Sequence, residues 1–277
     1  MPRRYTGSSV ALNAFVIVLS LVVILPIMWS IAVAFNYESV RSTDFGELLS
    51  RPFTLDNFAY VLTNQQARIA LWIGNSLLVA ASVTTAVLLL ASSAAFAFAR
   101  FRFVGRKLWF WVVIGGIMVP AEAKLIPLYL LFRDLRLLNT YWSLILPAVA
   151  APFGVVILYQ FIRGLPEELF DAAKIDGASS GVVFRIIVLP LTRAALASLA
   201  IFVFLGSWND FLWPFIVITK PSIMTVPVGI PFFNSQYASD MARPMAANVI
   251  ASAPVLIAFF LFQRNIVEGI SLTGIKG

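Results

Sequence analysis

The sequence predicts an all-α, polytopic integral membrane protein with six transmembrane helices and both termini in the cytoplasm. Hydrophobic residues make up 60% of the 277-residue chain and charged residues only 12%, whereas soluble domains are about half apolar and about one quarter charged. The apolar residues gather in runs of roughly the 20 residues that a bilayer requires. The larger share of the 20 basic residues falls in the segments assigned to the inside, as the positive-inside rule requires.

We expect one membrane domain over residues 1–277, without a separate soluble domain. The expected spans are approximately 10–35, 70–99, 108–131, 141–162, 185–218 and 245–263, with a cytoplasmic loop at 163–184 and a C-terminal tail at 264–277. The first run, Val10–Phe35, is uncharged. It is longer than the roughly 7–15-residue apolar core of a signal peptide. We therefore interpret it as an uncleaved span rather than a cleaved signal.

The second span ends in a basic cluster formed by Arg100, Arg102, Arg106 and Lys107. This cluster is the clearest cytoplasmic marker in the chain. A nucleic-acid patch is the weaker interpretation, because lysine and arginine in so apolar a chain set the topology and meet anionic lipid heads. The protein is therefore expected to contact membrane lipid and no nucleic acid.

Prolines and polar residues divide the later spans. We expect the third span to break near Pro120 and to continue as an irregular or surface-lying piece. The fifth span is predicted to be one apolar helix that contains Trp208, Asn209 and Asp210. An aspartate within a span costs about 2.5–3.5 kcal/mol on insertion scales, so Asp210 should face a cavity or a partner group.

The segment from Pro166 to Pro190 mixes charged and apolar residues between two greasy runs. Pro166, Glu167 and Glu168 are typical of a helix N-terminus. Gly177 is expected to end this short helix. The residues alone leave two interpretations open: a helix that docks into a cleft of another protein, or an amphipathic helix on the membrane surface.

Several kinds of chemistry have no residues to support them. The sequence contains no cysteine and no histidine, so the commonest metal ligands and the commonest general base are missing. It also lacks the glycine-rich Lys-Ser/Thr loop that binds ATP. We expect no enzyme activity, no catalytic residue, no metal site and no cofactor in this chain. Energy for transport would come from a partner subunit or an ion gradient.

The spacing within this segment resembles the "EAA" loop of bacterial ABC importer permeases. Asp171-Ala172-Ala173 is followed after three residues by Gly177, and Ile187 and Leu189-Pro190 follow at the family's interval. Asp171 stands where the family usually has Glu. The run Trp208–Pro214 and the ending Gly269–Gly277 resemble the carbohydrate-type permeases of the maltose-transporter class, which are binding-protein-dependent transport inner membrane components.

The resemblance implies a multi-pass subunit of the bacterial inner membrane that works in a larger machine. Its partners would be a second similar permease, two ATP-binding subunits that hold ATP and Mg²⁺, and an extracytoplasmic solute-binding protein that meets the outer loop at 220–242. The loop at 163–184 would be the coupling loop, and the ATP-binding subunits would dock on its helix at 166–180. Its contacts with the ATPase are assigned to Glu168, Asp171, Ala172, Ala173, Asp176 and Gly177.

The expected function is import of a sugar or sugar-like solute. Mono-, di- and oligosaccharides, amino sugars and glycerol phosphate esters all fit. Trp208, Asn209 and Asp210 are candidates for the solute pathway, because sugars stack on aromatic rings and bind amides and carboxylates. The alternative is that Asn209 and Asp210 bond the backbone or a neighbouring helix. An ion-coupled secondary transporter remains the second functional hypothesis.

Overall fold

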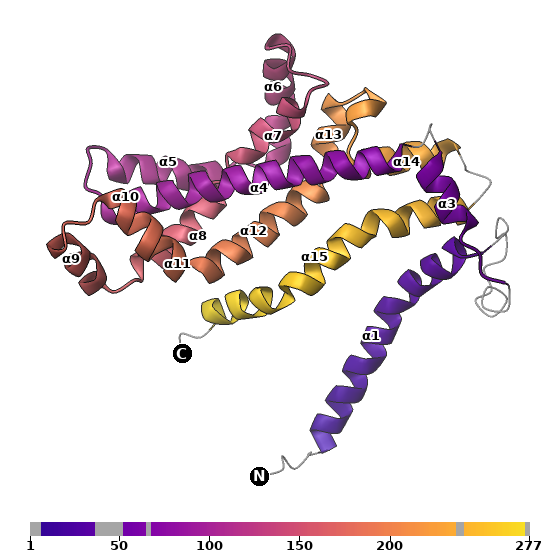
Figure 1. The fold of residues 1–277 in the computed structure, drawn as a ribbon, viewed down its shortest axis with the longest axis horizontal. Coiled ribbons are helices and arrows are strands. Elements are labelled where there is room, and N and C mark those ends of the chain that lie inside the picture. Colours follow the sequence, from indigo (N-terminus) through magenta and orange to yellow (C-terminus); the bar gives the residue numbers. More distant parts are fainter. Residues whose placement is uncertain (1–6, 37–51, 65–67, 237–240, 275–277) are drawn as a thin grey trace. The chain divides into compact units, whose positions relative to one another are not determined.

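The computed structural model describes residues 7–36, 52–64, 68–236 and 241–274. Within these ranges the chain is helical, and its only β pairing is an isolated bridge between Asn36 and Phe53. The all-α prediction is therefore confirmed. The chain forms two compact units, residues 1–70 with 229–254 and residues 71–228 with 255–277, and each is described by itself (Figure 1).

The first unit is built on α1 (Gly7–Ala34) and α3 (Asp56–Thr63). The side-chain amide of Asn57 in α3 donates to the carbonyl oxygens of Ala34 (3.0 Å) and Asn36 (2.7 Å). These bonds satisfy carbonyls that the end of α1 leaves without helical partners. Most side chains between residues 11 and 28 are exposed, as expected for a helix whose surroundings are lipid.

The second unit is organised around α4 (Ile69–Arg100). Its buried positions include the small residues Ala80, Ala91 and Ala95, which let membrane helices approach closely. Helix α8 (Pro152–Arg163) packs between α4 and α12 (Arg193–Trp208). An added methyl group at Gly154 of α8 would meet Leu199 at 3.1 Å and Ala91 at 3.4 Å. Gly154 therefore permits the close approach of all three helices.

Three expected spans are bent helix pairs. Helices α5 (Arg106–Met118) and α6 (Ala121–Asp134) meet at 100°, and α7 (Tyr141–Val149) and α8 meet at 40°. The break expected near Pro120 is confirmed, but α6 after it is a regular helix rather than an irregular piece. The segment Ser180–Leu191 meets α12 at 77°.

The fifth span is not one continuous helix, and that prediction was wrong. Helix α12 ends at Trp208, and α13 (Leu212–Val217) begins after a break at Asn209 and Asp210. Asn209 and Asp210 are poor helix formers that favour helix ends and turns. The apolar composition of the whole run hid this boundary.

The number of spans stays a prediction. In the described residues, two helices are long and apolar enough to cross a membrane singly, and the bent pairs raise the number to 5. A shorter apolar helix, Ala242–Ile257, forms the first part of α15 (Ala242–Gly274). Because α15 reaches Gly274, residues 264–274 of the expected tail are helical, while 275–277 lie outside the described residues.

Candidate functional site

The short helix expected between Pro166 and Gly177 is present as α9 (Glu167–Ile175). Its start follows Pro166 and carries Glu167 and Glu168 in the first turn, where negative charge is favourable. Its end is a paired backbone cap. The amide of Ala178 donates to the carbonyl of Ala173 at 2.9 Å, and the amide of Gly177 donates to the carbonyl of Lys174 at 3.1 Å.

Gly177 is required by this cap. Its φ is +72°, in the left-handed region where a side chain costs energy and glycine does not. No atom lies within 4 Å of the position that a Cβ would take. A residue other than glycine would therefore be disfavoured by backbone strain and not by a clash.

One face of α9 is exposed in the described chain. Glu168, Asp171, Ala172 and Ile175 are all exposed, and their spacing of three and four residues places them in one stripe along the helix. Ile175 is 87% exposed. Sequence reasoning did not assign Ile175 to the site, although its position seven residues after Glu168 was a signal that could have placed it there.

The remaining predicted contact residues divide between the two sides. Asp176 and Gly177 are exposed at the end of α9, beside the stripe. Ala173, by contrast, is only 7% exposed. Its methyl group therefore packs within this chain, and we now expect Ala173 to support α9 from behind rather than to touch a partner.

The opposite face of α9 is held by Arg100, the last residue of α4. The Cζ atom of Arg100 lies 3.6 Å from the centroid of the Phe170 ring, a cation–π contact. An Arg100 Nη1 atom lies 3.7 Å from Glu167 Oε1. That carboxylate is 88% exposed, so the ion pair contributes little.

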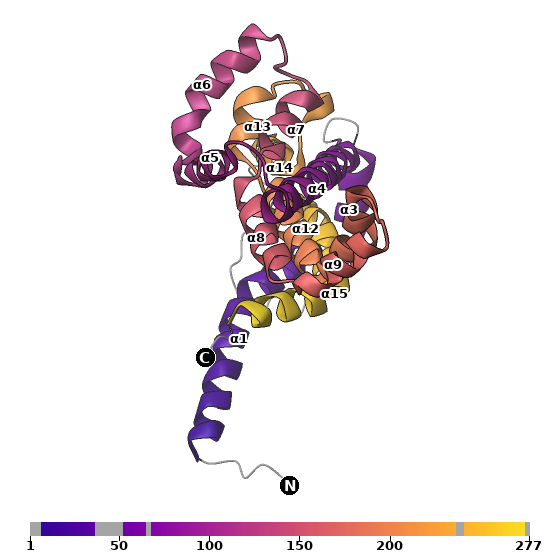
Figure 2. The same ribbon diagram turned by 90° about the vertical axis from the view of Figure 1, so that its left-hand side faces the viewer.

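Arg100 also forms hydrogen bonds with the backbone of the segment that leads into α9. Its Nη2 atom donates to the carbonyl oxygens of Ile162 (3.0 Å) and Leu165 (2.9 Å). Figures 1 and 2 both place α9 beside the C-terminal end of α4. Sequence reasoning missed this role and treated Arg100 as a topology signal, because nothing in the sequence distinguishes it from Arg102 or Arg106.

A second connection links α9 to the spans through residues 180–191. This stretch consists of α10 (Ser180–Val183), a π-helical turn at Phe184–Val188 and α11 (Leu189–Leu191). The ring of Phe184 packs on Phe96 of α4 with centroids 5.3 Å apart. The 77° bend into α12 follows Pro190, so α9 is tied to α4 on one side and to α12 on the other.

The predicted solute-pathway residues are sequence neighbours with different environments. Trp208 is 3% exposed, and its ring stacks on Phe204 with centroids 6.0 Å apart. Asn209 is exposed. Asp210 is half-buried and lines a cavity of about 240 Å³. Of the three, Asp210 is the one that lines this cavity.

The cavity at Asp210 has a mixed lining. Ser207 and Thr225 add hydroxyl groups, while residues such as Val79, Val83 and Leu144 add apolar surface. The Thr225 hydroxyl is buried and has no hydrogen-bond partner in the described part of the chain. An unsatisfied buried hydroxyl is costly, so a polar occupant of this cavity would be favoured. Sequence reasoning did not identify Thr225.

The end of the second unit that we expect to face the outside is held together by side chains that bond backbone atoms. Asn139 has a φ of +59°, a conformation that asparagine tolerates better than most residues. Its Oδ1 atom accepts hydrogen bonds from the amides of Thr219 (2.6 Å) and Lys220 (3.0 Å) and from the Thr219 hydroxyl (3.0 Å). The turn before α7 is thereby joined to the segment after α13.

Side chains of α4 and α7 hold the next residues of this segment, 221–224, by further hydrogen bonds. Trp72 Nε1 donates to the carbonyl of Pro221 (2.8 Å). Asn75 Nδ2 donates to the carbonyls of Ser222 (3.1 Å) and Met224 (2.8 Å), and its Oδ1 accepts from the Tyr141 hydroxyl (2.7 Å). We call residues 217–226 the outer clasp. It covers the first part of the outer loop expected at 220–242, of which 237–240 lie outside the described residues.

Replacing Asn139 with Ala is expected to loosen the outer clasp. The variant loses the oxygen atom that accepts hydrogen bonds from three donors. It also places alanine, whose side chain cannot form a local hydrogen bond, at a positive φ. The expected loss is about 1–2 kcal/mol of local stability. Hydrogen exchange of residues 217–226 in the purified protein measures it. Asn139→Asp keeps an acceptor and the tolerance of positive φ, and should exchange nearly as slowly as the parent. Equal exchange in the Ala variant would contradict the role of Asn139.

Comparison with known proteins places these features in a family. A family model described as "binding-protein-dependent transport system inner membrane component" matches residues 88–272. The arabinooligosaccharides transport system permease protein of Halalkalibacterium halodurans is 38% identical over 81% of this chain and 80% of its own length. The diacetylchitobiose uptake system permease protein of Streptomyces coelicolor is 36% identical over 97% of this chain and 88% of its own.

Another relative and a solved structure agree. The trehalose/maltose transport system permease protein of Thermococcus litoralis is 34% identical over 94% of both chains. In a crystal structure of a bacterial ABC transporter involved in alginate import, one chain matches with a TM-score of 0.83 and 18% identity over 95% of this chain and 99% of that one. That likeness shows the fold. The chain is therefore a multi-pass membrane protein that belongs to the binding-protein-dependent transport system inner membrane components.

Proposed function

We propose that this chain is the permease subunit of an ATP-driven importer that carries a sugar or sugar-like solute into the cytoplasm. The observation that carries this proposal is α9, whose outer stripe is exposed while its inner face is tied to α4 by Arg100. A helix that only lay on a membrane would not need an acidic stripe containing Glu168 and Asp171. A docking surface for another protein explains both faces.

The proposed machine contains a second similar permease, two ATP-binding subunits and an extracytoplasmic solute-binding protein. The ATP-binding subunits dock on the stripe of α9. When they close on ATP, α9 moves, and its two ties pass the motion to α4 and to α12. The binding protein delivers solute at the opposite end, where the outer clasp holds its backbone in a fixed position. A related crystal structure, matched with a TM-score of 0.54, contains an alginate ABC transporter in complex with a periplasmic protein.

The solute class follows from the relatives and from the cavity at Asp210. The relatives described above are permease proteins for arabinooligosaccharides, diacetylchitobiose and trehalose or maltose. The cavity at Asp210 offers one carboxylate and the hydroxyls of Ser207 and Thr225 beside apolar walls. That lining suits a neutral sugar, which presents hydroxyl groups together with apolar ring faces. We propose that this cavity lies on the solute pathway.

An alternative role for Asp210 has its own supporting observation. Its carboxylate accepts a hydrogen bond from the backbone amide of Trp213, as a residue at the start of α13 can. This bond and a solute contact are compatible, because a carboxylate has room for several donors. Removal of the Asp210 charge distinguishes the two roles, because it should slow uptake only if the carboxylate contacts the solute.

Replacing Asp210 with Asn is expected to slow solute uptake about tenfold. The amide keeps an acceptor for Trp213 but loses the charge-assisted bond to a sugar hydroxyl, which is worth roughly 1.5–3 kcal/mol. Initial uptake into proteoliposomes that hold the assembled transporter measures the effect. Asn209→Ala serves as the control, because Asn209 does not line the cavity. If Asp210→Asn transports at the parent rate, Asp210 is only a helix cap.

The proposed function is tested by purifying the chain together with the products of neighbouring genes. We expect ATP-binding subunits to co-purify, and uptake to require ATP together with the cognate binding protein. Uptake that an uncoupler abolishes while ATP stays constant would instead establish an ion-coupled transporter. Calorimetry of the binding protein with a panel of oligosaccharides then identifies the solute.

A further inference from the structure

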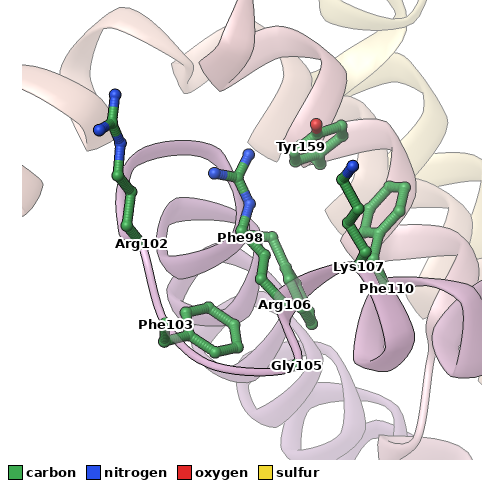
Figure 3. Close-up of a pocket in the computed structure, with 8 residues that line it drawn as sticks. All are labelled: Phe98, Arg102, Phe103, Gly105, Arg106, Lys107, Phe110 and Tyr159. Carbon is green, nitrogen blue, oxygen red and sulfur yellow. The ribbon is translucent and has the colours of Figure 1, made fainter.

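A second cavity lies where α4 turns into α5, away from both the stripe of α9 and the cavity at Asp210. Its volume is about 570 Å³. Three cationic side chains line it, those of Arg102, Arg106 and Lys107. The rest of the wall consists of Gly105 and the rings of Phe98, Phe103, Phe110 and Tyr159. Figure 3 shows the three cationic head groups and the Tyr159 hydroxyl on the same side of the turn. We call this cavity the basic pocket.

Within the described residues, no carboxylate balances the charges of the basic pocket. No carboxylate is among the residues that line it, and the ion pairs found in the described residues leave Arg102, Arg106 and Lys107 out. Arg106 makes one long hydrogen bond, from Nη1 to the carbonyl of Phe101 at 3.4 Å. Three like charges around one space repel each other, and an anion in that space would relieve the repulsion.

The walls of the basic pocket are held in place by packed rings from three helices. The Phe110 ring of α5 lies 4.5 Å from that of Tyr159 of α8 and 5.5 Å from that of Phe98 of α4, centroid to centroid. Gly105, with a φ of +79°, forms the tight turn that brings Arg102 and Arg106 to the same space. The basic pocket is therefore a built feature and not a chance meeting of surface side chains.

Exposed apolar side chains follow the basic pocket along the chain. Leu108, Trp109, Trp111 and Val112 follow it on the first turns of α5, and all four side chains are more than half exposed. Tryptophan is enriched where a span meets the membrane surface. A ligand that fills both features has a negatively charged head and an apolar tail.

We propose that the basic pocket binds the phosphate headgroup of an anionic phospholipid, of which phosphatidylglycerol is the probe. The acyl chains then lie against the exposed start of α5. Basic pockets between membrane helices on the cytoplasmic side bind such head groups in other proteins. The site lies outside the transport cycle proposed above, and its test reads lipid retention separately from uptake. A free phosphate shares the headgroup chemistry, and an acidic protein surface is the competing partner.

Native mass spectrometry of the assembled transporter tests this site. The complex is equilibrated with equal amounts of phosphatidylglycerol and phosphatidylcholine, and the retained lipids are counted. We expect the parent to retain phosphatidylglycerol selectively, and Arg102→Gln with Arg106→Gln and Lys107→Gln to weaken retention at least about tenfold, since each lost charge near the surface is worth roughly fivefold. The matched control replaces Lys124, Arg133 and Arg136 of α6 and the turn after it with Gln and should retain the lipid.

Two further variants keep the test decisive if the triple variant does not accumulate. Arg102→Lys with Arg106→Lys keeps the charge and should keep most of the retention, whereas Arg106→Gln alone should lose roughly fivefold. Because the chain contains no cysteine, a single introduced cysteine reports topology in each variant. If a variant changes topology, its result is set aside and the comparison uses Arg102→Lys with Arg106→Lys instead.

Four results would overturn the proposal. Unchanged phosphatidylglycerol retention in the triple variant would remove the site, and equal retention of phosphatidylcholine would remove the headgroup. Displacement of the lipid by millimolar inorganic phosphate would make the pocket a soluble-anion site. Loss of the ATP-binding subunits from the triple variant, with lipid retention unchanged, would assign the cations to an acidic surface of a partner protein.

Discussion

Replacing Arg100 with Gln is expected to uncouple ATP hydrolysis from transport. The variant loses both hydrogen bonds to the carbonyls of Ile162 and Leu165 and the cation–π contact with Phe170. A bond from a charged donor is worth about 1.5–3 kcal/mol, so α9 would lose most of its attachment to α4. The outer stripe of α9 is untouched, and the ATP-binding subunits should still assemble.

The measurement is the number of ATP molecules hydrolysed for each solute molecule imported by proteoliposomes. We expect uptake to fall at least about tenfold while ATP hydrolysis continues. A tenfold change corresponds to roughly 1.4 kcal/mol, and the loss of only part of these contacts exceeds that free energy. Arg100→Lys should also fail, because a compact ammonium group that donates to the two carbonyls has no planar group to stack on the Phe170 ring at the same time. Arg163→Gln removes an exposed cation at the C-terminal end of α8, next to Ile162, and should transport normally. An unchanged ratio in Arg100→Gln would show that α9 drives the spans through residues 180–191 alone.

Replacing Ile175 with Asp is expected to detach the ATP-binding subunits. Ile175 is 87% exposed and lies on the same stripe as Asp171 and Ala172. A few buried residues dominate most interfaces, each worth about 2 kcal/mol or more, which is about 30-fold in Kd. We expect Ile175 to be one of them. A carboxylate there must be desolvated on docking and adds a like charge beside Asp171.

Co-purification of the subunits, followed by titration of the ATP-binding subunit against the solubilised permease, measures the loss. Val104→Asp makes the same kind of change at a fully exposed position outside α9 and should leave assembly intact. Ile175→Leu keeps the apolar contact and should bind nearly as the parent does. If Ile175→Asp assembles with unchanged affinity, the docking surface lies elsewhere on the chain.

The sequence predicted α9 well because its limits are set by local chemistry. Pro166 at the start and Gly177 at the end act on their own backbone, so their spacing is enough to place the helix. The break near Pro120 was predictable for the same reason. The division of α9 into two faces was only partly predictable, since Ala173 and Ala172 are alike in sequence and differ in exposure.

The features that join distant residues could not be predicted. Arg100 and Phe170 meet because α4 and α9 pack together, and no short-range pattern connects them. The cavity at Asp210 includes Thr225 from a segment beyond α13, which sequence reasoning assigned to an outer loop. The end of α12 at Trp208 was hidden because α13 continues the apolar run.

The atoms that Arg100 holds determine how this joint can change during evolution. Both of its hydrogen bonds end on main-chain oxygens, at positions 162 and 165. The side chains at these two positions can therefore be exchanged without altering the bonds, provided that the backbone keeps its path. Tolerance to substitution should therefore differ between the two partners of this contact. Leu165, which is only partly buried, should accept many side chains, and Arg100 should accept almost none.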